Sequence, residues 1–218
     1  MKILHVYSGG LDSTVLLAKL LKEKNKVQGI NFYYGSNHNL QERAAARRVT
    51  KVLGVKLTEI NLDFIKEYFQ SALLAGADAI PEGHYQAENM KSTVVPFRNG
   101  IMLSIAAGFA ESQGLEAVSM AAHAGDHYIY PDCRPQFLDP MEDAIREGTE
   151  KRIQLMAPFY NRTKTGIVKL GNEIGAPMEL SYSCYRGGQL HCGTCGACNE
   201  RKEAFKDAGV KDPTRYEK

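Results

Sequence analysis

The sequence has neither a long run of like charges nor a long apolar run, and each absence excludes a class of protein. The net charge is +2, from 27 Lys and Arg against 25 Asp and Glu, and the two signs alternate along the chain. Without a basic tail or stripe, we expect no nucleic-acid partner. The apolar stretch after Lys2 is soon interrupted by glycines, and no later stretch approaches the length of a membrane span. We therefore expect a cytoplasmic protein that acts on small molecules, with no membrane partner.

The length suits one α/β domain with a small appendage. The chain has 218 residues, 44% hydrophobic and 24% charged, which is ordinary for a soluble globular protein. The predicted strands span residues 2–7, 27–34, 55–60, 93–96, 116–121 and 152–157. The predicted helices span residues 13–24, 40–53, 64–72, 99–113, 137–147 and 165–174. Strands that alternate with helices indicate a parallel, Rossmann-like sheet with crossover helices.

Cysteine is scarce in the first part of the chain and concentrated near its end. Cys133 stands alone, whereas four others lie within 15 positions: Cys184, Cys192, Cys195 and Cys198. We therefore predict an α/β domain at residues 1–181 and a zinc-binding tail at residues 182–218. Four thiolates complete a closed site, so the zinc is expected to be structural and catalysis to lie elsewhere. An iron–sulfur cluster or redox-active cysteines are the alternatives, although no fourth Cys-Pro follows at the ferredoxin spacing.

The segment SGGLDS at residues 8–13 lies between the first predicted strand and the first predicted helix. Its glycines let a phosphate approach the backbone, and the helix N-terminus points unpaired N–H groups at it. Asp12 could orient this loop or help to hold Mg²⁺ on a leaving pyrophosphate. The spacing matches neither the Walker motif nor GxGxxG, so a nicotinamide cofactor is not expected. The alternative is a plain turn capped by Asp12 or Ser13.

We predict three catalytic residues and a set of ATP-binding residues around this loop. Lys164 precedes the last predicted helix of the main domain and could stabilise phosphate charge, although an isolated lysine is more often simply exposed. The catalytic prediction is Asp12, Ser13 and Lys164. The ATP-binding prediction is Tyr7, Ser8, Gly9, Gly10, Leu11, Asp12, Ser13 and Thr14.

Two later segments offer groups for a second substrate. The segment PFRNG at residues 96–100 places a cation and an amide at a strand-to-helix junction, where α/β proteins bind ligands. Residues 123–135 follow a predicted strand and are dense in His, Asp, Tyr and Arg, and their carboxylates suit the N–H groups of a guanine-like base. Helix capping by Asn99, a solvated Arg98 and an Asx-type cap at Asp132 are the alternatives. The predicted substrate-binding residues are Arg98, Asn99, Asp126, Asp132 and Arg134.

The SGGLDS segment resembles the SGGxDS signature of the ATP-pyrophosphatase superfamily. That resemblance implies an adenine-nucleotide alpha-hydrolase-like fold with a parallel sheet. It also implies that ATP is cleaved between its α and β phosphates. A substrate oxygen would attack the α phosphate, which gives an adenylated intermediate and pyrophosphate.

Four segments in order make the resemblance more specific. These are residues 8–13, PFRNG at 96–100, YPDCRP at 130–135 and CYRGG at 184–188 with the later cysteines. Together they resemble the 7-cyano-7-deazaguanine synthase family over essentially the whole chain. The resemblance implies that 7-carboxy-7-deazaguanine, ammonia and two ATP give the nitrile through an adenylated acid and an adenylated amide. It also implies bound zinc and a homodimer. Residues 36–37 and 75–90 depart from the family pattern, and a relative that stops at the amide is an alternative.

Two further hypotheses come from other classes of protein. A tRNA sulfur-transfer enzyme would share the phosphate loop, but it needs a persulfide-carrying cysteine and a basic surface. Cys133 is the only cysteine outside the cluster, and the near-neutral charge argues against tRNA. A non-catalytic zinc module that binds nucleotide as a signal would keep residues 8–13 and would release no AMP.

Overall fold

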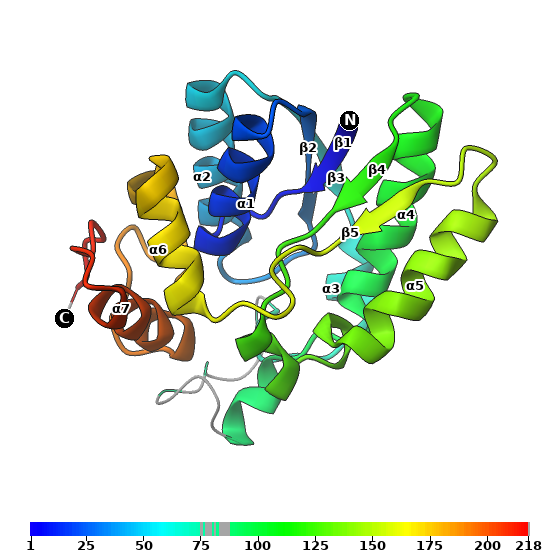
Figure 1. Ribbon diagram of the computed structural model, residues 1–218. Coiled ribbons are helices and arrows are strands. Elements are labelled where there is room, and N and C mark those ends of the chain that lie inside the picture. The colour runs from blue at the N-terminus through cyan, green and yellow to red at the C-terminus, as the bar shows by residue number, and fades with distance from the viewer. Residues whose placement is uncertain (75, 77–79, 81, 83–87, 218) are drawn as a thin grey trace.

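A five-stranded parallel sheet forms the centre of the protein (Figure 1). The computed structural model describes residues 1–74, 76, 80, 82 and 88–217. The strands are β1 (Lys2–Val6), β2 (Lys26–Tyr33), β3 (Lys56–Asn61), β4 (Ala117–Ser119) and β5 (Gln154–Met156). Their order is β3-β2-β1-β4-β5, and every neighbouring pair is parallel. The predicted Rossmann-like parallel sheet is therefore confirmed.

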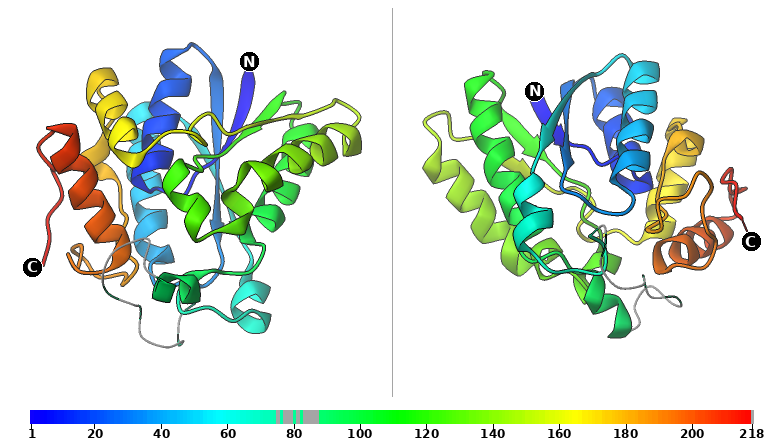
Figure 2. Two further views of the ribbon diagram at one scale, coloured as in Figure 1. Left: turned by 60° about the horizontal axis from the view of Figure 1, so that its bottom comes forward. Right: turned by 180° about the vertical axis from the view of Figure 1, so that it is seen from behind.

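Helices cover both faces of the sheet (Figure 2). The α-helices are α1 (Leu11–Lys22), α2 (Asn39–Leu53), α3 (Asp63–Tyr68), α4 (Arg98–Ser112), α5 (Pro135–Gly148), α6 (Lys164–Ile174) and α7 (Gly196–Ala208). The 3₁₀ helices are η1 (Glu88–Thr93), η2 (Ala124–Tyr128), η3 (Pro131–Cys133) and η4 (Met178–Leu180). Neighbouring residues of β1 point to opposite faces, so Ile3 packs with α1 and α6 while Leu4 packs with α4 and α5. Burial on both faces explains why β1 reads as an apolar run.

The strand predicted at residues 93–96 does not form. η1 ends at Thr93, whose hydroxyl donates to the carbonyl of Met90 at 2.6 Å. The backbone N–H of Val94 then bonds the carbonyl of Lys91 at 3.1 Å, and the chain turns into α4. β1 already has β2 and β4 as its two neighbours. Local hydroxyl bonding therefore prevails over the apolar composition that suggested a strand.

One stretch contradicts the expectation that nothing in the chain approaches the length of a membrane span. Met90–Ser112 covers 23 residues, contains an 18-residue window with a mean hydropathy of 1.2, and passes the test of length and composition. The stretch contains α4, whose buried residues Met102, Leu103 and Ala106 belong to the core cluster that includes Leu4 of β1. Packing in the protein core accounts for the apolar composition.

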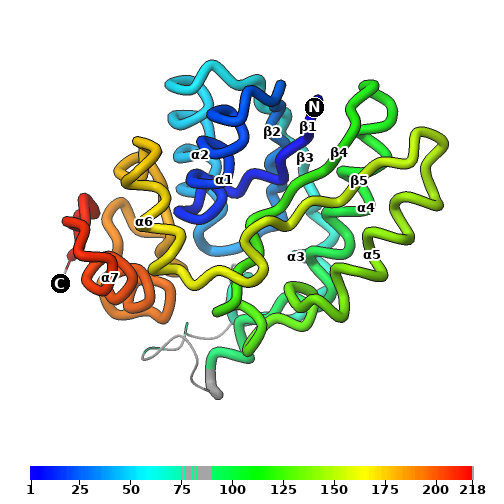
Figure 3. Tube along the Cα trace, in the orientation of Figure 1, coloured from blue at the N-terminus to red at the C-terminus, as the bar shows by residue number. Residues whose placement is uncertain are grey.

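The tail packs directly on the α/β part of the chain. Ala204 and Phe205 of α7 share one core cluster with α1 and α6, and α7 runs beside α6 in the tube view (Figure 3). Arg201 is 1% exposed and donates to Ser181 Oγ and to the carbonyl of Met178, each at 3.0 Å. The division at residue 182 remains a prediction. Most of residues 75–87, where the family pattern is less well matched, lies outside the described residues.

The loop after β1 is packed tightly against α2. Gly9 has φ +92°, a conformation that glycine adopts far more readily than other residues. A Cβ at Gly9 would lie 2.3 Å from the carbonyl oxygen of Glu42 and 2.8 Å from the backbone N of Ala46. Both contacts are with helix backbone, which cannot move aside cheaply. Only glycine therefore fits at this position.

We predict that Gly9→Ala destabilises the fold by about 3 kcal/mol or more, because a strained φ adds to overpacking. Gly108→Ala is the matched control: Gly108 lies in α4 and a Cβ there meets nothing within 4 Å. That variant should gain up to about 1 kcal/mol, since alanine is the better helix former. Urea denaturation measures both, and equal stability of the two variants would contradict the packing described here.

Candidate active site

A cavity of about 230 Å³ opens at the carboxyl ends of β1, β2 and β4. This is the switch point of the sheet, since the chain runs outward from β1 to β2 and β3 on one side and to β4 and β5 on the other. Open α/β sheets bind ligands at such points. The predicted site residues that line the cavity are Tyr7, Ser8, Gly10, Leu11, Asp12, Ser13, Arg98, Asn99, Asp126 and Lys164. The predicted residues outside the lining are Gly9, Thr14, Asp132 and Arg134.

The loop at residues 8–13 is ordered by its own hydroxyls. Ser8 Oγ accepts from the N–H of Gly10 at 3.1 Å, and Ser13 Oγ accepts from the N–H of Ser8 at 3.3 Å. No side chain caps the N-terminus of α1 among the described residues. The first turn of α1 lines the cavity instead, so its unpaired N–H groups are available to an anion.

Thr14 and Tyr7 support this loop from behind. Their hydroxyls bond each other at 3.0 Å, and Asn31 Nδ2 donates to the carbonyl of Tyr7 at 2.8 Å. Gly9 lies against α2, as described above. The loop is therefore shaped by Tyr7, Thr14 and Gly9, and of these three residues only Tyr7 also lines the cavity.

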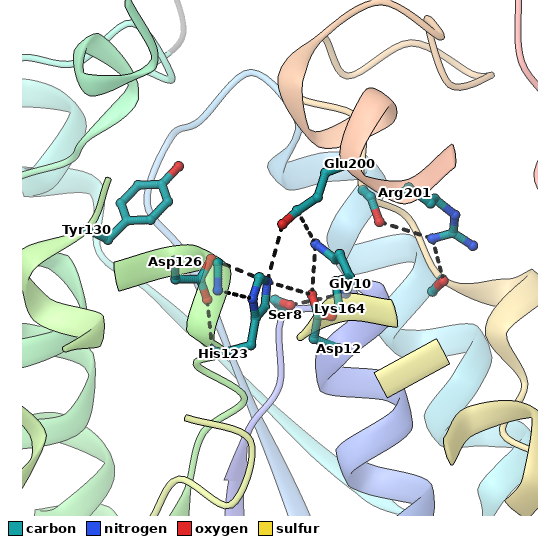
Figure 4. A network of polar contacts seen from close by, with 12 residues as sticks. Ser8, Gly10, Asp12, His123, Asp126, Tyr130, Lys164, Glu200 and Arg201 are labelled. Atoms are coloured by element: carbon teal, nitrogen blue, oxygen red, sulfur yellow. Dashed lines mark hydrogen bonds and ion pairs between the residues drawn. The ribbon is translucent and has the colours of Figure 1, made fainter. Parts of the chain in front are cut away.

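Lys164 joins the loop to the tail. Its Nζ lies 3.2 Å from Asp12 Oδ2 and 2.6 Å from Glu200 Oε2, and Figure 4 shows it between the two carboxylates. Burial opposes the charge of Lys164, but Asp12 and Glu200 raise its pKa above the usual value. Burial alone would raise the pKa of Asp12, yet Lys164 and then His123 hold it below the usual range. The structure thus places a cation and an anion in the cavity lining beside the first turn of α1.

His123 brings a third carboxylate to the same group. It is 1% exposed, and its Nε2 lies 3.4 Å from Asp126, 3.8 Å from Asp12 and 3.9 Å from Glu200. Asp126 Oδ2 also accepts from the His123 backbone N–H at 3.0 Å. Burial raises the pKa of Glu200, which Lys164 opposes only in part.

Sequence reasoning missed His123 and Glu200 as members of this group. His123 follows β4 closely, and that position at the carboxyl edge was a usable signal. Glu200 comes two residues after the last cysteine of the cluster, and only the folding of the tail brings it to Lys164.

Asp132 and Arg134 support the neighbouring loop. Asp132 Oδ2 accepts from the backbone N–H of Asn99 at 2.8 Å, at the start of α4. Arg134 Nε donates to the carbonyl of His127 at 2.7 Å. Neither side chain lines the cavity, so a direct contact of either with a base is not supported by these positions.

Arg98 and Cys133 do face the cavity. Arg98 donates to the Tyr34 hydroxyl at 2.8 Å and lies over the Tyr34 ring, 5.2 Å from its centroid. Cys133 Sγ accepts from Asn99 Nδ2 at 3.2 Å. Burial, with Asp126 and Asp132 nearby, raises the pKa of Cys133 well above its usual value. A protonated thiol is a poor nucleophile.

The four clustered cysteines are arranged so that they could hold a metal ion. Their Sγ atoms are buried and all lie within 4.8 Å of one another. Cys192 Sγ and Cys198 Sγ are 3.9 Å apart, far beyond a disulfide of about 2.05 Å. Backbone N–H groups donate to two of the sulfurs, from Cys192 to Cys184 Sγ at 3.3 Å and from Cys195 to Cys192 Sγ at 3.4 Å. Four convergent sulfurs with such donors suit a tetrahedral ion.

We predict that Lys164→Met is less stable than the wild type, and more so at neutral pH than at acid pH. In the wild type the lowered pKa of Asp12 contributes stability above the unfolded pKa of that carboxyl, which is lost as the pH falls through the folded pKa. Without the cation, Asp12 and Glu200 stay buried with raised pKa values. The variant should lose about 3–5 kcal/mol at about pH 7.5. At about pH 5 its loss of stability should be smaller by at least about 1 kcal/mol.

Lys169→Met on the same helix is the control, because Lys169 is exposed. It should stay within about 0.5 kcal/mol of the wild type at both pH values. Urea denaturation at the two pH values measures the difference. A deficit for Lys164→Met that does not change with pH would show that the group contributes no charge interaction to stability.

The chain resembles known proteins over its full length. It matches the family model described as "Queuosine biosynthesis protein QueC" over residues 2–209. A Porphyromonas gingivalis protein named 7-cyano-7-deazaguanine synthase is 52% identical over 212 residues, covering 97% of this chain and 96% of that protein. A Desulfotalea psychrophila protein of the same name is 49% identical over 211 residues, with 97% and 96% covered. One from Rhizobium etli is 44% identical over 220 residues, with 100% and 92% covered.

Solved structures share the fold at much lower identity. A complex of a 4-thiouridine synthetase with RNA and bound ATP aligns with a TM-score of 0.51 and 18% identity, over 95% of this chain and 50% of that one. That similarity concerns the fold alone. The family model and the full-length relatives decide the assignment: the chain belongs to the QueC family of queuosine biosynthesis proteins.

Proposed function

We propose that the protein is an ATP-dependent ligase that converts 7-carboxy-7-deazaguanine and ammonia to 7-cyano-7-deazaguanine, with release of AMP and pyrophosphate. The observation that carries the proposal is the meeting of two features in one cavity. One part of the cavity is lined by the start of α1, whose N–H groups suit an anion, and by the buried Lys164. Another part of the cavity is lined by polar residues suited to a second substrate. The names and near-complete coverage of the relatives supply the substrate.

ATP is proposed to bind at residues 7–14. The N–H groups at the start of α1 would donate hydrogen bonds to a phosphate, and Lys164 would stabilise the negative charge that develops on the leaving pyrophosphate. Asp12 Oδ1 is buried and has no hydrogen-bond partner among the described residues. A carboxylate oxygen of this kind suits Mg²⁺, so Asp12 fits the role of holding the ion that accompanies ATP. When bound, the ion would neutralise phosphate charge.

The chemistry requires two adenylations of one substrate. The 7-carboxylate oxygen attacks the α phosphorus, which forms a P–O bond and expels pyrophosphate. Ammonia then attacks the acyl carbon, and AMP leaves to give the amide. The amide oxygen attacks the α phosphorus of a second ATP and expels a second pyrophosphate. Loss of AMP and of the two amide protons then leaves the nitrile. Adenylation is needed because an amide oxygen leaves poorly, whereas AMP leaves well. In each adenylation Lys164 and the α1 N-terminus stabilise negative charge.

The metal of the cysteine cluster is proposed to be zinc with a structural role. Four thiolates fill a tetrahedral site and leave no position for water or substrate. Cys195 is the N-cap of α7, so the metal would fix the start of the helix that carries Glu200. The tail at residues 182–218 is therefore proposed as a zinc-binding subdomain that serves the active site.

Partners and location follow from the same proposal. The protein is proposed to act in the cytoplasm on small molecules as a homodimer, with neither nucleic acid nor membrane as a partner. The tRNA sulfur-transfer alternative would rest on Cys133. That thiol is buried and its pKa is raised, which does not favour a persulfide carrier.

The test of function is mass spectrometry of the products formed from ATP, Mg²⁺, ammonium and 7-carboxy-7-deazaguanine. We expect nitrile, AMP and pyrophosphate from the wild type. Asp12→Ala should lower AMP formation by at least about 1,000-fold, since the carboxylate proposed to hold Mg²⁺ at the phosphates is lost, while its zinc content stays unchanged. Amide as the sole product would identify a relative that stops one step earlier. Full activity of Asp12→Ala would contradict the assignment of the phosphate loop.

A separate prediction concerns zinc. The purified wild type should contain one zinc ion per chain. Cys195→Ser should lose this zinc ion, and its free energy of unfolding should fall by about 3 kcal/mol or more. Elemental analysis and thermal denaturation measure the two effects. Cys133→Ser is the matched control, because Cys133 lies outside the cluster, and it should keep its zinc. A metal-free Cys195→Ser that is as stable as the wild type would refute the structural role.

A further inference from the structure

Glu42 carries a carboxyl group into the cavity beside the phosphate loop. It lies in the first turn of α2, where its backbone oxygen packs against Gly9. Its side chain lines the cavity together with Tyr34, His38 and Arg98. Sequence reasoning assigned no role to Glu42 or His38, and the ATP chemistry proposed above uses neither.

Glu42 and His38 are short of hydrogen-bond partners among the described residues. The Glu42 side chain is 17% exposed, and its one ion-pair contact among the described residues is with His38 Nε2 at 3.6 Å. That separation exceeds a good hydrogen bond. His38 is 3% exposed, and its Nδ1 has no hydrogen-bond partner in the described part of the chain. Burying a carboxyl group without donors is costly, and burial raises the pKa of Glu42 to about 8, although Arg98 acts in the opposite direction. A ligand with N–H donors would remove this cost.

The other acidic side chains near the cavity already have donors. Asp132 caps α4 through Asn99. Asp126 accepts from the His123 backbone and faces the His123 ring. Asp12 and Glu200 both pair with Lys164. Glu42 is therefore the lining carboxyl group whose two oxygens are most available to a ligand.

A carboxylate accepts hydrogen bonds, so it favours a substrate whose edge presents donors. A guanine-type base presents two adjacent donors, the ring N1–H and the 2-amino group, which match the two oxygens of one carboxylate. Adenine presents a single amino group next to a ring nitrogen with a lone pair, which a carboxylate repels. Arg98 lies close enough to Glu42 to influence its ionisation and so supplies a neighbouring cation for an acidic substituent or carbonyl oxygen.

We propose that Glu42 is the specificity-determining residue that binds the N1–H and 2-amino groups of the 7-deazaguanine substrate, an inference that rests on the function proposed above. Recognition of this edge predicts strong rejection of a base that lacks the 2-amino group, because a buried carboxylate oxygen would lose its partner.

The experiment compares 7-carboxy-7-deazaguanine with its hypoxanthine analogue, which lacks the 2-amino group, in AMP-release assays. The wild type should show at least about 10-fold lower kcat/KM with the analogue. Glu42→Gln should raise KM for the guanine-type acid by at least about 10-fold. It should also accept both acids to within about threefold, since the charged acceptor is gone, while KM for ATP stays within about twofold. Glu67→Gln is the control at an exposed glutamate and should behave as the wild type.

The outcomes separate the two proposals. Wild-type turnover of the acid with undiminished discrimination in Glu42→Gln would overturn the role of Glu42 and leave the proposed function intact. A rise in KM for ATP equal to that for the acid would also overturn it, since Glu42 would then contact the nucleotide. A wild type that turns over neither acid would overturn the proposed function and this inference with it. Thermal denaturation of Glu42→Gln checks that the variant is folded.

Discussion

The ion pairs of Lys164 hold together three parts of the chain that are far apart in sequence. Asp12 comes from the loop after β1, Lys164 from the start of α6 and Glu200 from α7. Each of these charges is largely buried. Removing one partner would therefore leave an uncompensated buried charge, which destabilises the folded protein. The cost of assembling this group is offset by the packing of α7 on α1 and α6. The result is a fixed cation beside the first turn of α1, which lines the cavity.

The tail contributes to the active site through this group and is more than an appendage. The cysteine cluster fixes the start of α7, and Arg201 fixes its middle through bonds to Ser181 and Met178. Glu200 lies between these two anchors. A shift of α7 by a fraction of a turn would move the Glu200 carboxylate away from Lys164. The proposed adenylation would need charged groups that are positioned with that accuracy. A structural metal can therefore matter for turnover without touching a substrate.

Local pattern was enough to predict the sheet, most helices and the phosphate loop. Gly54 directly follows the second predicted helix and ends α2 with φ +66°, because that position requires a left-handed residue. The SGGLDS spacing predicted the loop between β1 and α1 for a similarly local reason, and its role in binding ATP remains a prediction. The failures came where long-range packing decides: residues 93–96 are apolar enough for a strand, but the sheet offers no place beside β1. Glu200 and Glu42 acquire their significance only from the surroundings that the fold creates, and no spacing in the sequence reports that.

The division of the cavity also bears on how one site could adenylate two different groups in succession. The acid and the amide differ only at the C7 substituent, whereas the N1–H and 2-amino edge is the same in both. If Glu42 holds that unchanged edge, the base need not be rebound in a new orientation between the two steps. In the proposed site, the groups at the start of α1 and Lys164 would interact with phosphate, whether the attacking oxygen belongs to a carboxylate or an amide. Constant recognition at one part of the cavity and charge stabilisation at the other are thus sufficient for two rounds of the same chemistry, with only ATP and its products exchanged between them.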